Sequence, residues 1–151
     1  MNEYIRPRFA VFYRAPYWSP YVEFVEQLRK TGAYIVYDVD DFVFDKTIIP
    51  QIDGYKVLTE DQKRGFVDGV AAYRNFILNA DLCTLATNFL VDEVKKLGTP
   101  AARVRNSISD ENIQVFEDIN YQRPERPSPF VVGYYSGTNT PQADFAVAAP
   151  A

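Results

Sequence analysis

The segment YIVYDVDDFVFD, residues 34–45, decides the fold that we expect for this chain. It begins as an apolar, β-branched run typical of a buried strand, and the carboxylates Asp38, Asp40 and Asp41 follow within and directly after that run. In open α/β sheets, ligands bind outside the carboxyl ends of the strands. The three acids therefore lie where a functional site is expected.

Strand and helix signals alternate on both sides of this segment. Residues 8–14 predict a strand that ends at Arg14, next to the acidic segment. Ser19, as N-cap before Pro20, opens a predicted helix that stops at residues 31–32, and the next strand runs from 33 to about 40. This order is that of a right-handed βαβ unit.

The alternation continues to about residue 106. Residues 45–56 are expected to be irregular, and the capping-box pattern at 59–62 opens a predicted helix over 60–79. A strand at 82–87, a helix at 88–96 and a strand at 102–106 follow. The long helix has an apolar stripe of Phe66, Val70, Tyr73, Ile77 and Leu78. The whole pattern predicts an α/β fold with a parallel, doubly wound sheet.

The chain changes character after residue 106. Residues 107–128 are polar, carry prolines and show no sustained period, which is typical of a connector between domains. A strand is predicted at 130–135, and apolar residues at helical spacing follow the turn at 136–141. We expect residues 1–108 to form one domain, 109–129 a linker, and 130–151 the first βα unit of an incomplete second domain. In the competing interpretation the protein is complete and its last strand joins the single sheet.

Composition excludes several classes of function. The 151 residues include no histidine, so Ser-His and Cys-His nucleophiles and His-containing zinc sites are ruled out, and we predict no metal or cofactor. A net charge of −4 argues against bulk binding of nucleic acid. The single cysteine, Cys83, lies in an apolar run and is expected to be a small buried residue. Without an apolar run of about 20 residues or a secretory signal, the chain is expected to be cytoplasmic, with no transmembrane segment.

Three segments resemble bacterial glycosyltransferases of the GT-B type, of the kind grouped with families 1 and 4. YDVDDFVFD at 37–45 looks like a strand end in their N-terminal domain, and residues 81–98 look like a strand and helix of that domain. VGYYSGTNT at 132–140, with DFAVAAP at 144–150, looks like the opening of their donor-binding domain. The resemblance implies a Rossmann-like N-terminal domain that holds the acceptor, and the start of a domain that holds the nucleotide-sugar.

The resemblance also implies roles for particular residues. Arg14, Asp38, Asp40 and Asp41 would line the acceptor side of the cleft. The loop of Ser136, Gly137, Thr138 and Asn139 would approach the donor phosphate, which agrees with the preference of helix N-termini for anions. Tyr17 and Trp18, after the first strand, could stack on a sugar ring or simply pack.

The full enzyme would transfer a sugar from a nucleotide-sugar to a sugar or lipid-linked acceptor, in polysaccharide biosynthesis. The chain departs from the family pattern in ways that affect this expectation. The paired glutamates that relatives carry later in the donor domain are absent, and Arg105-Asn106 follows the predicted fourth strand where many relatives have Pro-Asn. We therefore expect a fragment that is inactive alone.

Other functions fit the acidic segment less closely. Asp38 and Asp40 could act as the nucleophile and general acid of a haloacid dehalogenase-like phosphatase, although no later lysine or second acidic loop follows. The acids could also be structural, with Asp40 or Asp41 capping the turn and Asp38 bonding to the backbone or pairing with Arg14. A different class of function is a non-catalytic α/β interaction domain that self-associates through its C-terminal unit.

Overall fold

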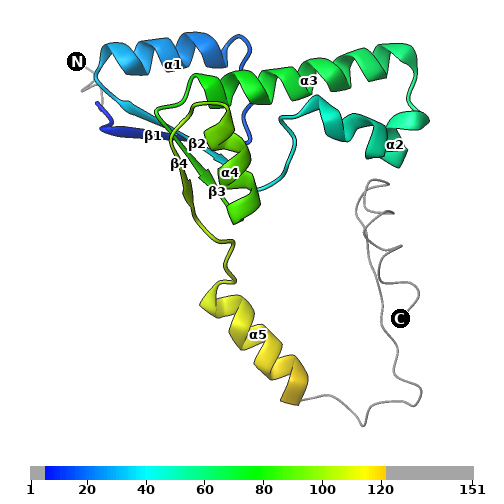
Figure 1. Cartoon of the computed structure of the whole chain (residues 1–151). Helices are drawn as coiled ribbons and strands as arrows, with labels where there is room; N and C mark the ends of the chain where they lie inside the picture. Colours follow the sequence, from blue (N-terminus) through cyan, green and yellow to red (C-terminus); the bar gives the residue numbers. More distant parts are fainter. Residues whose placement is uncertain (1–5, 122–151) are drawn as a thin grey trace. The chain divides into compact units, whose positions relative to one another are not determined.

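A computed structural model describes residues 6–121 of the chain (Figure 1). The chain divides into two compact units, Met1–Arg105 and Asn106–Ala151. The first unit contains the sheet and most of the helices. None of the helices in residues 6–121 is long and apolar enough to cross a membrane.

The first unit is built on a parallel sheet of four strands in the order β1-β2-β3-β4. The strands are β1 (Phe9–Tyr13), β2 (Tyr34–Val39), β3 (Leu82–Leu85) and β4 (Ala101–Arg103). Helices follow the strands, so the predicted α/β, Rossmann-like parallel sheet is confirmed. The doubly wound arrangement is not seen among these strands, because they lie in chain order with no reversal.

The helices between these strands pack on one face of the sheet. They are α1 (Tyr21–Lys30), α3 (Glu60–Leu78) and α4 (Asn88–Lys96), and Figure 1 shows α1 and α3 running along the same side. Crossovers of one hand between successive neighbouring strands place every connecting helix on the same side. Val25, Phe76 and Val94, one from each helix, join a single core with the sheet residues Ile35, Tyr37, Val39, Cys83 and Leu85.

The opposite face of the sheet, here called the open face, is not covered by any helix of residues 6–105. The register aligns Phe9 with Tyr34, then Val11 with Val36 and Leu82, then Tyr13 with Asp38 and Thr84. Val11 is 66% exposed and Phe9 62% exposed. Parallel sheets are normally buried on both faces, so this apolar surface is unusual for its class. The open face comprises Phe9, Val11, Tyr13, Tyr34, Val36, Asp38, Leu82 and Thr84.

Local signals set most helix ends. The predicted capping box at the start of α3 is present, with Thr59 and Gln62 bonding each other's backbone N–H groups. Gly32 and Gly98, which follow α1 and α4, have φ values of 83° and 89°, a backbone conformation that glycine adopts readily. The prediction for the start of α1 is wrong in detail. Pro20 is the N-cap residue, and the Ser19 hydroxyl bonds to Glu23 instead of to the backbone.

The structure differs from the sequence predictions in three other segments. Residues 45–56 are not irregular, because they include the 3₁₀ helix η1 (Lys46–Gln51) and the short helix α2 (Asp53–Lys56). Leu78 is 50% exposed, whereas Phe76, left out of the predicted stripe, is fully buried. The second unit contains the helix α5 (Asp110–Tyr121) where a connector without helical period was predicted. The predicted strand at 130–135 and the turn at 136–141 lie outside the described residues.

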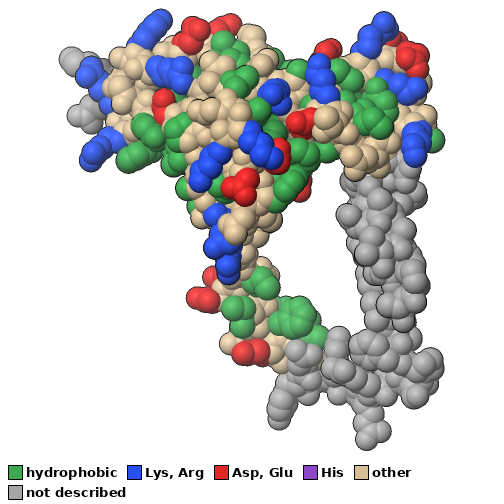
Figure 2. Space-filling view, in the orientation of Figure 1, with side chains coloured by type: hydrophobic (Ala, Val, Ile, Leu, Met, Phe, Trp, Pro, Cys, Tyr) green, Lys and Arg blue, Asp and Glu red, His purple; other side chains and the backbone are tan. Residues whose placement is uncertain are grey.

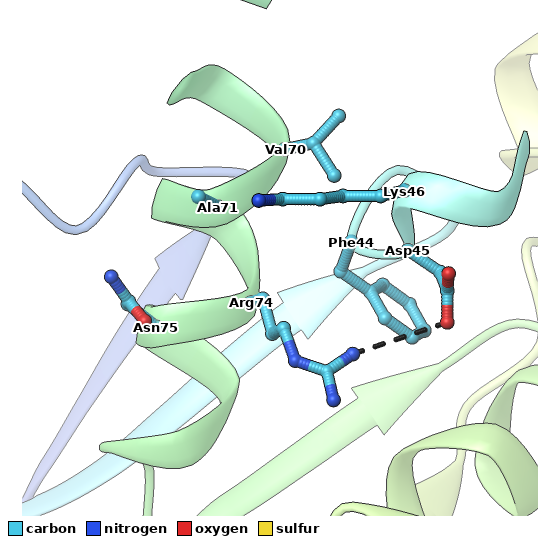
Figure 3. Close-up of a pocket in the computed structure, with 7 residues that line it drawn as sticks. All are labelled: Phe44, Asp45, Lys46, Val70, Ala71, Arg74 and Asn75. Carbon is cyan, nitrogen blue, oxygen red and sulfur yellow. Dashed lines mark ion pairs between the residues drawn. The ribbon is translucent and has the colours of Figure 1, made fainter. Parts of the chain in front are cut away.

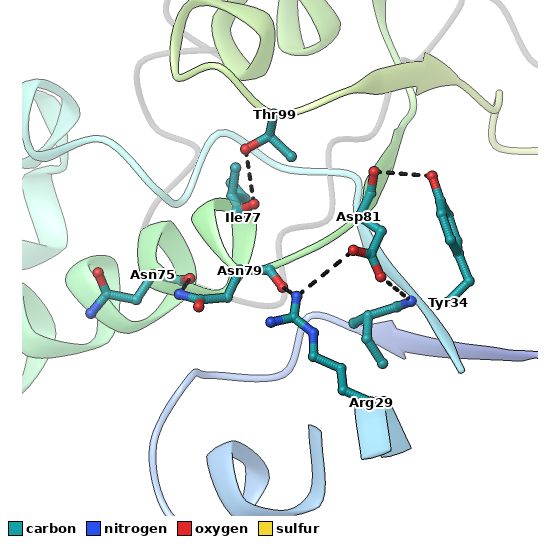
Figure 4. A network of polar contacts seen from close by, with 8 residues as sticks. Arg29, Tyr34, Asn75, Ile77, Asn79, Asp81 and Thr99 are labelled. Carbon is teal, nitrogen blue, oxygen red and sulfur yellow. Dashed lines mark hydrogen bonds and ion pairs between the residues drawn. The ribbon is translucent and has the colours of Figure 1, made fainter. Parts of the chain in front are cut away.

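A polar network at the amino edge of the sheet ties β2, β3, α1 and α3 together (Figure 4). The Asp81 carboxylate accepts a hydrogen bond from the Ile35 N–H at 2.7 Å, and its second oxygen lies 3.9 Å from the Arg29 guanidinium. Arg29 also donates to the Asn79 carbonyl, and the Tyr34 hydroxyl donates to the Asp81 carbonyl at 3.1 Å. This end of the sheet is therefore fixed by side chains, and the opposite, carboxyl edge is where a ligand would be expected.

Candidate functional site

The carboxyl edge of the sheet brings together Arg14, Asp40 and Asp41, here called the carboxyl-edge cluster. Arg14 follows β1 directly, and the two acids follow β2, the neighbouring strand. Arg14 Nη1 lies 2.9 Å from Asp41 Oδ2 and 3.7 Å from Asp40 Oδ1. One guanidinium therefore compensates two carboxylates that would otherwise repel each other.

Arg14 has an unusual backbone conformation, with a φ of 47°. Its N–H still donates to the Asp38 carbonyl at 2.9 Å, so the β1–β2 pairing extends one residue beyond β1. A residue with a Cβ pays on the order of 1–2 kcal/mol for left-handed backbone. Such strained positions are concentrated at functional sites, where the surroundings enforce them.

Tyr13 adds a hydroxyl to the cluster. Its Oη lies 3.4 Å from Asp40 Oδ2, within reach of a weak hydrogen bond. Partial burial acts to lower the pKa of Arg14, but the Tyr13 hydroxyl and the carboxylates of Asp41 and Asp40 outweigh it, so the pKa lies above its ordinary value. The cluster is open to solvent, with 55% of the Asp41 side chain exposed. Ion pairs this exposed add little stability, and the carboxylate oxygens stay accessible to a ligand.

Asp38 lies apart from the other two acids. Its neighbours Tyr37 and Val39 point into the core, so Asp38 points to the open face, where its Oδ2 accepts a hydrogen bond from Thr84 Oγ1 at 2.5 Å. The register places Tyr13, Asp38 and Thr84 in one row across β1, β2 and β3. The apolar open face therefore ends in a polar row at its carboxyl edge, beside the cluster.

Of the other predicted site residues, Trp18 is 50% exposed on the loop after β1, whereas the Tyr17 ring packs edge-on against Phe76 at 5.3 Å between centroids. Cys83 is fully buried, and burial raises the pKa of its thiol to about 12, so the thiol stays protonated. The predicted donor-phosphate loop of Ser136, Gly137, Thr138 and Asn139 lies outside the described residues. In residues 6–121, no group of three or more His, Cys, Asp or Glu side chains could hold a metal ion.

Sequence reasoning missed a pocket between the loop after β2 and the middle of α3 (Figure 3). Its volume is about 480 Å³, and it is lined by Phe44, Asp45, Lys46, Val70, Ala71, Arg74 and Asn75. Asp45 accepts a hydrogen bond from the Thr47 N–H at 2.8 Å, which is the chief cause that lowers its pKa. Lys46 and Arg74 are 28 positions apart, and no local motif connects them. Only the tertiary fold brings these two cations to one pocket.

The visible surface of the first unit carries basic and acidic side chains interspersed among apolar ones (Figure 2). Comparison of the chain with protein-family models, with curated proteins and with solved structures found no match. The case for function therefore depends on the residues and on their geometry.

Proposed function

We propose that residues 6–105 are the acceptor-side domain of a GT-B-like glycosyltransferase, which moves a sugar from a nucleotide-sugar to an acceptor in polysaccharide biosynthesis. The observation that carries the proposal is the meeting of Arg14, Asp40 and Asp41 at the carboxyl edge of a parallel sheet. That edge is where ligands bind in open α/β sheets.

The chemistry of the carboxyl-edge cluster suits a sugar acceptor. Carboxylate oxygens accept hydrogen bonds from sugar hydroxyls, and the Arg14 guanidinium can donate to ring or hydroxyl oxygens. Asp40 or Asp41 could also take the proton of an attacking hydroxyl, a task that histidine often performs and that this chain must assign to another residue type. The exposed Trp18 ring, on the loop after β1, offers a face for stacking.

Saturation-transfer NMR with glucose, galactose, N-acetylglucosamine and rhamnose tests acceptor binding. We expect at least one sugar to receive saturation from the wild-type chain and to lose most of it in the double variant Asp40→Asn/Asp41→Asn. Asp61→Asn, at an exposed position on α3, is the matched control and should behave as wild type. Failure of all four sugars to bind the wild type, or equal signals from the double variant, would contradict the proposal.

The assignment of this domain to the acceptor, and not to the nucleotide-sugar donor, has a separate test. An acceptor-side domain should not bind the donor tightly, so calorimetric titration of the chain with UDP-glucose should give no heat beyond dilution at micromolar protein. Micromolar affinity accompanied by shifts of amides near the carboxyl-edge cluster would mean that this edge holds the donor, and the assignment to the acceptor would be wrong.

The open face supports a second candidate, a non-catalytic interaction domain that pairs with another copy of itself. Phe9, Val11 and Val36 form an apolar surface on a sheet type that is normally covered on both faces. The surface is also free of Lys and Arg side chains, and its one acid, Asp38, is bonded to Thr84. An apolar surface of this kind is self-complementary, as a two-fold contact requires.

Light scattering after size exclusion separates the two candidates. If the open face joins two copies, the wild type should become dimeric as concentration rises, and Val11→Lys should keep it monomeric. Val57→Lys is the control, because Val57 is 80% exposed and lies outside the open face. A wild-type monomer at all concentrations, or a dimer unaffected by Val11→Lys, would rule out this candidate.

A further inference from the structure

The Lys46–Arg74 pocket described above has the charges of an anion site. Its seven lining residues include two cations, Lys46 and Arg74, and one anion, Asp45. The local balance is therefore one positive charge in excess, in a chain whose overall net charge is −4. A cationic pocket on an acidic protein is not a consequence of composition.

Neither cation is engaged by a close partner. The Arg74 guanidinium lies 3.9 Å from Asp45 Oδ2, which is at the outer limit of an ion pair. In residues 6–121, Arg74 makes no other ion pair or side-chain hydrogen bond, and Lys46 makes none at all. The Asp45 carboxylate is partly committed elsewhere, because its other oxygen accepts from the Thr47 N–H at 2.8 Å. Most donors of the two cations thus remain available.

The two cations reach the pocket from different elements. Lys46 begins η1 and extends its chain toward α3, with the ammonium near Ala71, while Arg74 projects from α3 toward Asp45 (Figure 3). Buried Phe44 and Val70 contribute to the wall and fix the loop against the helix. The site is therefore held by packed side chains and not by a solvated charge run.

We propose that this pocket binds the phosphate group of a small phosphorylated molecule, with Lys46 and Arg74 as its two cationic ligands. A phosphate monoester carries close to two negative charges at neutral pH, which matches two cations presented from separate elements. A carboxylate would be satisfied by a single bidentate arginine. The volume of about 480 Å³ leaves room for a body of the size of a sugar beside the phosphate. This inference is independent of the proposed acceptor role of the carboxyl-edge cluster.

Titration of the ¹⁵N-labelled full chain with glucose 1-phosphate tests the proposal. Inorganic phosphate, glucuronate and glucose serve as comparison probes for the phosphate alone, a carboxylate and a neutral sugar. We expect amide shifts of residues 44–47 and 70–75 with glucose 1-phosphate and with inorganic phosphate, weaker shifts with glucuronate, and none with glucose. Two results would overturn the proposal. One is the absence of shifts in these segments at about 10 mM glucose 1-phosphate, a concentration that half-saturates a site with a dissociation constant of that order. The other is equal shifts with glucose.

Charge variants identify the ligands. Loss of one unit charge about 5 Å from an anion at a protein surface weakens binding roughly fivefold or more, so Lys46→Gln and Arg74→Gln should each do so. Lys63→Gln is the control. Lys63 lies on α3, as Arg74 does, but it is outside this pocket and pairs with Glu60 at 2.8 Å. Asp45→Asn should instead strengthen binding severalfold, since it removes the competing carboxylate. A gain in affinity cannot result from a loss of folding. If both Lys46→Gln and Asp45→Asn bind with unchanged affinity, Lys46 and Arg74 are not the ligands of the phosphate.

Discussion

Thr84 on β3 donates a hydrogen bond to Asp38 on β2, with 2.5 Å between Oγ1 and Oδ2, and the two residues are direct partners in the β2–β3 register. This cross-strand pair explains how a carboxylate is accommodated at the carboxyl edge of the open face, next to the apolar residues of that face. It also separates Asp38 from Asp40 and Asp41, although the three acids lie close together in the sequence.

The pair should contribute to stability. Thr84→Val keeps the β-branched shape and removes only the hydroxyl, so we expect the free energy of unfolding to fall by about 1 kcal/mol, the usual net worth of a hydrogen bond. The same change in an Asp38→Ala background should cost much less, which a double-mutant cycle by urea denaturation measures. Equal costs in the two backgrounds would mean that the hydroxyl stabilises the sheet in some other way.

Arg14 combines strained backbone with a role in charge compensation, and two substitutions separate these effects. Both Arg14→Ala and Arg14→Gly remove the ion pairs to Asp40 and Asp41, but only glycine relieves the strain of a φ of 47°. Arg14→Gly should therefore be more stable than Arg14→Ala by about 1 kcal/mol. At Arg64, exposed on α3, the order should reverse, because alanine is the better helix former. Chemical denaturation of the four variants checks both orders.

Features set by neighbouring residues could be predicted from the sequence. The strand at 34–39, the capping box of Thr59 and Gln62, and the glycine stops at Gly32 and Gly98 are confirmed for this reason. The cap that was predicted wrongly, at Ser19, belongs to the same class of signal. There the hydroxyl donates to the Glu23 carboxylate at 3.0 Å, four residues along the chain, and Pro20 takes the N-cap position.

Features set by pairing between distant segments could not be predicted. Tyr34 and Val36 on one face of β2 are as apolar as Ile35 and Tyr37 on the other, so the sequence of this strand does not indicate which face the helices leave open. The doubly wound sheet was predicted from the alternation of strands and helices, which does not determine the order of the strands in the sheet. Asp38 pairs with Thr84, and Arg74 lies beside Asp45 and in one pocket with Lys46. These neighbours become visible only once the strand register and the packing of α3 are known.

Tyr37 holds a hydroxyl in the core without a hydrogen-bond partner among the described residues. Its ring is fully buried and stacks on Phe76, with 4.4 Å between centroids. Tyr37→Phe keeps this packing and removes the unsatisfied oxygen, so stability should be unchanged or rise by up to about 1 kcal/mol. Tyr34→Phe is the contrasting control, because that hydroxyl donates to the Asp81 carbonyl and its loss should destabilise. Thermal and urea denaturation decide whether the two substitutions differ in this direction.

Asp81 links the ends of β2, β3 and α1 at the amino edge of the sheet. Asp81→Ala leaves the Ile35 N–H without its acceptor and removes the partner of Arg29, so we expect a loss of about 1–3 kcal/mol, the cost of an unsatisfied and partly buried donor. Asp61→Ala removes an acid whose pairing with Arg64 is fully at the surface and should cost less than about 0.5 kcal/mol. Similar losses from the two substitutions in urea denaturation would show that the network has no structural role beyond a surface ion pair.

The pH dependence of stability should reveal the role of Asp45. The hydrogen bond from the Thr47 N–H and the charge of Arg74 hold its pKa below the ordinary value of 3.8, so the folded state favours the ionised form. A lowered pKa in the folded state means that the stabilisation is fully present above the unfolded pKa and is lost as pH falls through the folded pKa.

Asp45→Asn keeps a capping side chain but cannot ionise. It should be less stable than wild type at pH 7, and the difference should shrink as pH falls below 3.8 and through the lowered pKa of the folded state. Asp45→Ala also removes the cap of η1 and should cost about 1 kcal/mol more at every pH. Urea denaturation of the three proteins from about pH 2.5 to about pH 7 makes the comparison, and a wild-type advantage over Asp45→Asn that stays the same across this range would contradict the assigned charge effect.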